Sequence, residues 1–158
     1  MTTETKNVFI SHVHKDDKGL TDLKNLLKSK GMAVRDSSVN SDRPNNAKSP
    51  DYIKSKILAP RIDWASTMIV YISPETKNSE WVNWEIERAH KQDKTIVGVW
   101  ERGANGCEVP EALDDYGHAL VGWNADKIID AVNGDYEQFE TPDGATCQPR
   151  PIRRHPCG

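Results

Sequence analysis

Apolar residues along this chain follow two kinds of pattern, continuous short runs in some segments and a spacing of three or four positions in others. Short apolar runs are typical of buried strands, whereas apolar residues that recur every three or four positions are typical of one helix face. The most apolar run, 66–73, is expected at the centre of a parallel sheet, where both faces of a strand are buried. The pattern predicts strands at 7–11, 32–35, 66–73, 95–100 and 118–121, and helices at 15–30, from Pro50 onward, from Asn78 or Ser79 to Gln92, and at 125–132.

This alternation of strands and helices predicts one α/β domain over residues 6–134. Five strands in this order favour a flavodoxin-like fold, with a five-stranded parallel sheet and helices on both faces. Ligands of such folds bind in a crevice outside the carboxyl ends of the strands. Residues 37–49 are expected to form a long polar loop, and residues 101–115 a turn-rich stretch.

The composition changes after Gly134. Residues 135–158 contain four of the nine prolines and two of the three cysteines, and three arginines follow one another closely at 150, 153 and 154. We expect an irregular or disordered tail there.

Charge and hydropathy exclude several functional classes. The net charge of −3 gives no overall basic field for nucleic acid or an anionic membrane surface. The longest apolar run, 68–72, is too short to cross a bilayer, and residues 1–6 lack the apolar stretch of a secretory signal. The three cysteines have neither zinc-like nor redox spacing, so we expect a reduced, cytoplasmic protein.

The most informative polar residues lie on the helix predicted before Gln92. Trp81 and Glu85 are four residues apart and therefore share one helix face, while Glu87 points elsewhere. Spacing alone favours a core tryptophan and a solvated surface acid. The alternative is a carboxylate beside an indole near the ligand crevice.

Two motifs resemble a known family. Trp81 and Glu85 match the WxxxE pattern of TIR domains that cleave NAD⁺. The opening Val8-Phe9-Ile10-Ser11-His12, with Asp16 after it, is similar to the first strand and loop of TIR and TIR-like domains. The resemblance covers about residues 6–134 and is strongest to the bacterial TIR-like group of Thoeris antiphage defence, which includes ThsB. The sequence departs from better-known TIR domains at His12, where an aromatic residue usually follows the serine.

The resemblance implies an enzyme of the NAD⁺ nucleosidase type, an ADP-ribosyl cyclase or transferase included, with Glu85 as the catalytic residue. It places Phe9, Ser11, His12, Asp36 and Trp81 at the substrate. Ser11 has a local alternative as the cap of the first helix, and Asp36 as a turn former.

The same resemblance gives expectations for ligands and partners. NAD⁺ is the substrate, and neither a cofactor nor a metal is expected. The product would be an ADP-ribose-derived signal, either a cyclic isomer or an amino-acid conjugate, that activates a separate effector. A phage-derived trigger or self-assembly is expected to control it.

Other functions remain to be compared with this one. The main alternative is a non-catalytic TIR module that acts through protein contacts. Metal binding by His12, His14 and Asp16 is disfavoured because the other histidines are scattered. A receiver domain is excluded because the third strand ends in Ile72-Ser73, with no aspartate to accept phosphate. No phosphate-binding glycine motif is present.

Overall fold

Five strands pair in one parallel sheet in the order β2-β1-β3-β4-β5. The computed structural model describes residues 4–12, 17–36, 59–73, 76, 80–101, 109–136 and 139–140. The elements are β1 (Glu4–Ser11), α1 (Asp17–Lys28), β2 (Met32–Asp36), α3 (Ala59–Trp64), β3 (Thr67–Ile72), α4 (Glu80–Lys91), β4 (Thr95–Trp100), α5 (Glu111–Tyr116), β5 (Ala119–Val121) and α6 (Ala125–Val132). The predicted flavodoxin-like topology is thus confirmed.

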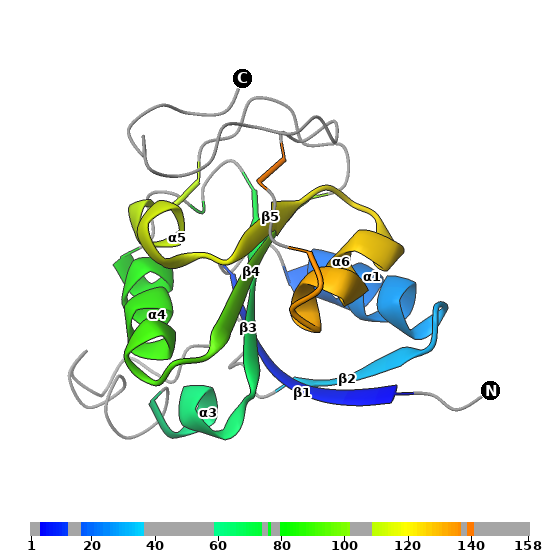
Figure 1. Cartoon of the computed structure of the whole chain (residues 1–158), viewed down its shortest axis with the longest axis horizontal. Coiled ribbons are helices and arrows are strands. Elements are labelled where there is room, and N and C mark those ends of the chain that lie inside the picture. Colours follow the sequence, from blue (N-terminus) through cyan, green and yellow to red (C-terminus); the bar gives the residue numbers. More distant parts are fainter. Residues whose placement is uncertain are drawn as a thin grey trace.

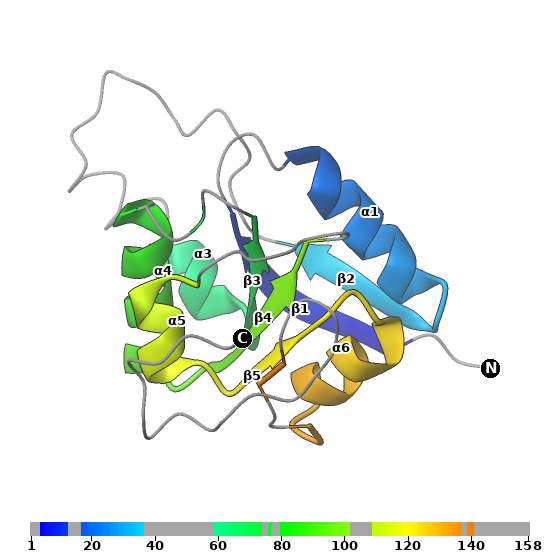
Figure 2. The same ribbon diagram turned by 90° about the horizontal axis from the view of Figure 1, so that it is seen from above.

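Helices cover both faces of the sheet (Figure 1 and Figure 2). Leucines of α1 and apolar residues of α6 bury one face, together with Val8 and Ile10 of β1. The other face is buried by α3, α4 and α5, together with Phe9 of β1. All six residues of β3 are buried, which confirms that this strand is central.

Most predicted elements differ from the observed ones only at their ends. The strand predicted from residue 7 begins at Glu4, and the first helix begins at Asp17. The first part of the helix expected from Pro50, and the loop at 37–49, lie outside the described residues. The turn-rich stretch predicted at 101–115 is wrong in its last part, because α5 occupies Glu111–Tyr116. Residues 102–108 lie outside the described residues.

The beginning of the segment expected to form a tail packs on the sheet. Phe139 forms a parallel bridge with Leu120 of β5. The Glu140 amide donates to the Leu120 carbonyl at 2.8 Å, and Trp100 Nε1 donates to the Glu140 carbonyl at 2.8 Å. Figure 1 shows this short segment, in orange, beside β5. Within residues 135–158, the structure describes only 135–136 and 139–140.

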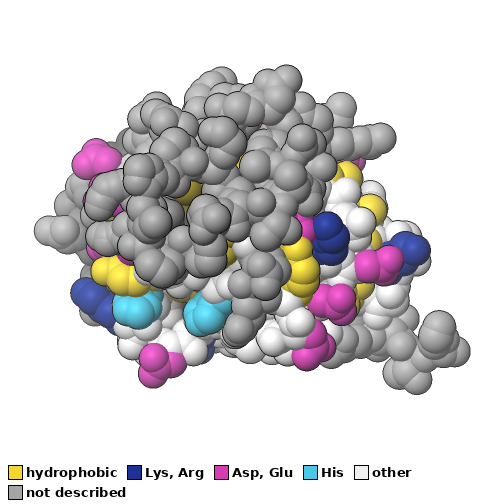
Figure 3. Space-filling view, turned by 45° about the horizontal axis from the view of Figure 1, so that its top comes forward, with side chains coloured by type: hydrophobic (Ala, Val, Ile, Leu, Met, Phe, Trp, Pro, Cys, Tyr) yellow, Lys and Arg dark blue, Asp and Glu magenta, His cyan; other side chains and the backbone are white. Residues whose placement is uncertain are grey.

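Two surface properties bear on partners. Acidic and basic side chains of the described residues are interspersed on the face drawn in Figure 3. None of the described helices is long and apolar enough to cross a membrane.

Gly98 in β4 permits the close approach of α5 to the sheet. A Cβ atom at this position would lie 2.7 Å from Leu113 Cδ2 and 2.8 Å from Leu120 Cδ1. We expect Gly98→Ala to lower the free energy of unfolding by about 1–3 kcal/mol, because overpacking forces the neighbours to move. Urea denaturation would measure the loss. The substitution should cost less in a Leu113→Ala background, and an equal cost in both backgrounds would contradict this explanation.

Candidate active site

The strand order reverses between β1 and β3. From β1 the chain passes outward to β2, while from β3 it passes through β4 to β5 on the other side. Ser11, the last residue of β1, pairs with Val70 of β3. The carboxyl end of β1 therefore lies at the switch point, where α/β sheets of this kind form their ligand crevice.

Strand alternation determines where the side chains of β1 point. Phe9 is 1% exposed and packs in the cluster that α4 covers. Because side chains two residues apart share a face, Ser11 also faces α4. Its side chain is fully buried. Ser11 does not cap the first helix, which begins six residues later at Asp17, so that alternative is wrong.

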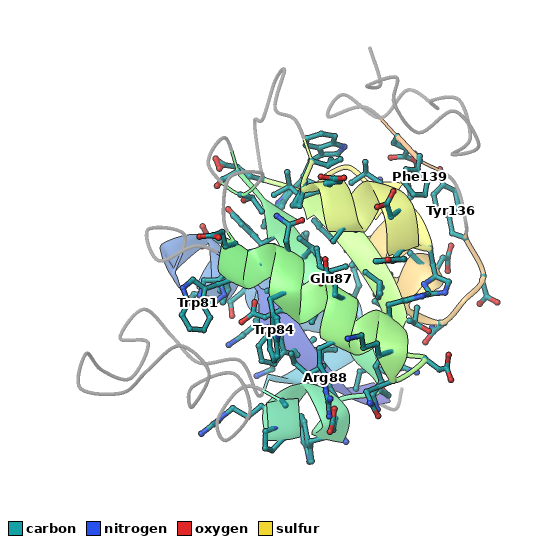
Figure 4. The ribbon with its side chains drawn as sticks, turned by 90° about the vertical axis from the view of Figure 1, so that its left-hand side faces the viewer. Trp81, Trp84, Glu87, Arg88, Tyr136 and Phe139 are labelled. Atoms are coloured by element: carbon teal, nitrogen blue, oxygen red, sulfur yellow. The ribbon has the colours of Figure 1, made fainter. Side chains whose placement is uncertain are left out.

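The inner face of α4 carries one carboxylate within an apolar stripe. Val82, Ile86 and Ala89 are buried, and Glu85 shares their face with 0% exposure. The surface-acid alternative for Glu85 is therefore wrong. Glu87, two residues further on, is exposed and lies on the outer side of α4 in Figure 4.

Ser11 and Glu85 are joined by a short hydrogen bond. Ser11 Oγ donates to Glu85 Oε1 at 2.6 Å, and both side chains are fully buried. This length is typical of a hydroxyl that donates to an ionised carboxylate. A carboxylate is thus held at the carboxyl end of β1 by a residue of the strand itself.

His12 follows Ser11 and is 2% exposed. Its Nδ1 lies 2.8 Å from the Ile10 carbonyl oxygen. A carbonyl only accepts, so Nδ1 carries a proton and donates it. This bond fixes the orientation of the ring.

The remaining predicted residues lie around this pair at different depths. Trp81 is half-buried one helical turn before Glu85, and Figure 4 shows it near the amino end of α4. Asp36 ends β2, and its backbone pairs with Val8 of β1. The Asp36 side chain lies outside the described part of the structure. The structure therefore joins Ser11 to Glu85, buries His12 directly after Ser11 in the chain, and buries Phe9 in the core that α4 covers.

Two contacts hold α4 against its neighbouring helices. Arg88 donates to both carboxylate oxygens of Asp63 in α3, at 3.0 and 2.6 Å, and lies on the side of α4 nearest α3 in Figure 4. Asn83 Oδ1 accepts from the Ala112 amide at 2.9 Å, in the first turn of α5. These contacts fix the position of α4, and with it that of Glu85.

Sequence reasoning missed a turn that follows β3 at the same edge. The Ser73 amide donates to Thr76 Oγ1 at 2.8 Å, and this hydroxyl in turn donates to the Tyr71 carbonyl at 3.2 Å. Both Ser73 and Thr76 are buried. Serine and threonine at this spacing often form such side-chain turns, which is the signal that would have found it.

No cluster of three or more histidine, cysteine, aspartate or glutamate side chains that could hold a metal ion is found among the described residues.

Two solved structures are similar to this chain over part of its length. A CMP N-glycosidase, BcmB of Clostridium botulinum, is 23% identical over 60% of this chain and 71% of its own, with a TM-score of 0.41. The TIR domains of the activated Roq1 resistosome, which recognises the pathogen effector XopQ, are 21% identical over 60% of this chain and 57% of theirs, with a TM-score of 0.40. A search among curated proteins found no match.

The chain also matches a protein family over most of its described domain. The family described as Thoeris protein ThsB, TIR-like domain, matches residues 9–106. This range is more than half of the chain, and it contains Ser11, His12, Trp81 and Glu85. The chain therefore belongs to the family of ThsB TIR-like domains.

Proposed function

We propose that this protein consumes NAD⁺ by breaking the bond between nicotinamide and ribose, with Glu85 as the catalytic carboxylate. The observation that carries the proposal is the fully buried Glu85, held by Ser11 Oγ at 2.6 Å where the strand order reverses. Burying a carboxylate on an otherwise apolar helix stripe costs stability, so its presence there favours a functional role. The WxxxE spacing within a TIR-like family supplies that role.

The chemistry of NAD⁺ suits a single carboxylate. Nicotinamide departs as a neutral molecule from a cationic pyridinium, so the leaving group needs no proton. The difficult step is the positive charge that develops on the ribose as the bond lengthens, as in glycoside hydrolysis. A fixed negative charge in a water-poor site stabilises that charge without having to reorganise.

The neighbouring residues fit a nucleotide around Glu85. His12 continues the strand that carries Ser11, and Trp81 precedes Glu85 by one helical turn. We propose that Ser11, His12, Trp81 and Asp36 border the substrate, and that Phe9 supports the site from the core that α4 covers. NAD⁺ is the substrate in this scheme, and no further cofactor is required.

The product follows from what reaches the ribosyl cation. Water yields ADP-ribose, the substrate's own adenine or ribose yields a cyclic isomer, and an amino acid yields a conjugate. A site that excludes water favours the last two outcomes. We propose that the product is a diffusible signal that activates a separate effector in antiphage defence. Uncontrolled NAD⁺ loss would be toxic in the cytoplasm, so the proposal includes a phage-derived trigger or self-assembly.

Incubation of the protein with NAD⁺ tests this proposal, with extracts of phage-infected and uninfected cells as the source of the trigger. We expect equal amounts of NAD⁺ lost and nicotinamide released, and mass spectrometry would identify the product. A cyclic isomer is lighter than ADP-ribose by one water, and a conjugate is heavier by an amino acid less one water. NAD⁺ that stays intact with every extract would favour the interaction module instead.

A further inference from the structure

We infer that Ser11 is a positioning residue for Glu85 and makes no hydrogen-bond donation to the substrate. This inference rests on the proposed function, and it departs from the substrate contact that the family resemblance implies for Ser11. It follows from the number of protons on a serine hydroxyl and from the way the structure holds both partners.

The hydroxyl of Ser11 has a single proton to donate. That proton is committed to Glu85 Oε1 at 2.6 Å. The phosphates of NAD⁺ only accept hydrogen bonds, so Ser11 cannot serve them while it holds Glu85. The bond to an ionised acceptor is also stronger than one between neutral groups, which favours the arrangement observed.

The two partners come from elements that are held independently. Ser11 lies in β1, which is paired with β2 on one side and with β3 on the other. Glu85 lies in α4, which Arg88 and Asn83 tie to α3 and α5. The hydroxyl therefore starts from a rigid backbone, and the flexible partner is the glutamate side chain, with its three rotatable bonds.

Holding that side chain is useful only for the chemical step. If the side chain loses this bond, a smaller part of the population holds its charge at the ribose, and the rate falls in proportion. Binding of NAD⁺ through its phosphates and adenine would change little. The loss of Ser11 should thus appear in kcat much more than in KM.

The experiment compares Ser11→Ala, Ser11→Thr and Ser66→Ala with the wild type in NAD⁺ cleavage. Ser66 is a control because its hydroxyl also makes a hydrogen bond, in this case to the Asn7 carbonyl of β1 at 3.2 Å, but lies at the amino end of β3, away from Glu85. We expect kcat to fall about 10- to 100-fold in Ser11→Ala, as for a lost bond to a charged group. KM should stay within about threefold. Ser11→Thr keeps the hydroxyl and should restore most of kcat, and Ser66→Ala should match the wild type.

A loss confined to KM would overturn the inference and make Ser11 a substrate contact. An unchanged kcat in Ser11→Ala would also overturn it, with the proposed function intact. An inactive wild type would instead refute the proposed function.

If the wild type is inactive, NMR spectroscopy still tests the inference, because it needs no enzyme activity. The ¹³C chemical shift of the Glu85 carboxyl carbon, assigned by its absence in Glu85→Gln, should move in Ser11→Ala and stay near the wild-type value in Ser11→Thr. A shift that is unchanged in Ser11→Ala would overturn the positioning role.

Discussion

Glu85→Gln is expected to cleave NAD⁺ about 10²-fold or more slowly than the wild type, judging by the cost of removing one group that stabilises transition-state charge. The substitution keeps the size and shape of a side chain that is fully buried. Ser11 can still donate to the amide oxygen of glutamine, so the geometry of the pair is kept. What disappears is the negative charge that, in the proposed mechanism, stabilises the ribosyl cation.

Glu87→Gln provides the matched control for this result. It makes the same chemical change two residues away on α4, at a side chain that is exposed. Nicotinamide release would be measured for both variants, and urea denaturation would show that both are folded. If both variants keep the wild-type rate, Glu85 is not catalytic; if both lose it equally, the effect belongs to the helix rather than to the carboxylate.

The sheet could be predicted because its signal is local. Every residue of β3 is buried, so a continuous apolar run was enough to place this strand at the centre. The parallel direction of the strands followed from the alternation with helices, since parallel neighbours need a crossover connection. For the strands, only the exact ends depended on tertiary contacts.

Helix α5 was missed because part of its signal lies elsewhere in the chain. It has only six residues and follows Pro110, which offers no side-chain cap. The acceptor for the Ala112 amide comes instead from Asn83 of α4, and Tyr116 stacks on His90 of the same helix at 4.0 Å between ring centroids. A short helix stabilised by a neighbour leaves little trace in its own sequence.

The burial of Glu85 was available in the sequence, but its partner was not. Val82, Ile86 and Ala89 form an apolar stripe at helical spacing, and Glu85 falls within it. That stripe predicts burial more directly than the tryptophans do. The hydrogen bond to Ser11 joins residues 74 positions apart, so it depends on how α4 packs on β1.

Glu140 is the second site where we expect a large effect, this time on stability. Its carboxylate is 1% exposed and accepts from the Gly122 amide at 3.1 Å, from Lys127 Nζ at 2.8 Å and from the Tyr136 hydroxyl. Figure 4 shows Tyr136 and Phe139 beside each other in the same segment. This network fastens the end of the described chain to β5 and α6.

Glu140→Ala should lower the free energy of unfolding by about 2–4 kcal/mol, because it removes a buried acceptor from three donors and breaks an ion pair. Lys127 is partly exposed and regains water, which keeps the loss below that of a fully buried pair. Urea denaturation at neutral pH would measure it. Glu87→Ala, at an exposed position, is the control and should lie within about 0.5 kcal/mol of the wild type.

The same network predicts how that loss depends on pH. Burial alone raises the pKa of Glu140, but the hydrogen bonds from Lys127, Tyr136 and Gly122 outweigh it and hold the pKa below its ordinary value of 4.5. The hydrogen bond to Glu140, with burial, raises the pKa of Tyr136 from 10.0 to about 12.

The stabilisation by Glu140 is therefore fully present above pH 4.5 and is lost as pH falls through its lowered pKa. The stabilisation by the neutral phenol is present below pH 10.0 and is lost as pH rises towards 12. The difference in free energy of unfolding between the wild type and Glu140→Ala should thus be largest from about pH 5 to 10 and decrease on both sides. If this difference stays constant into acid, the charge of the Glu140 carboxylate plays no part in holding this segment.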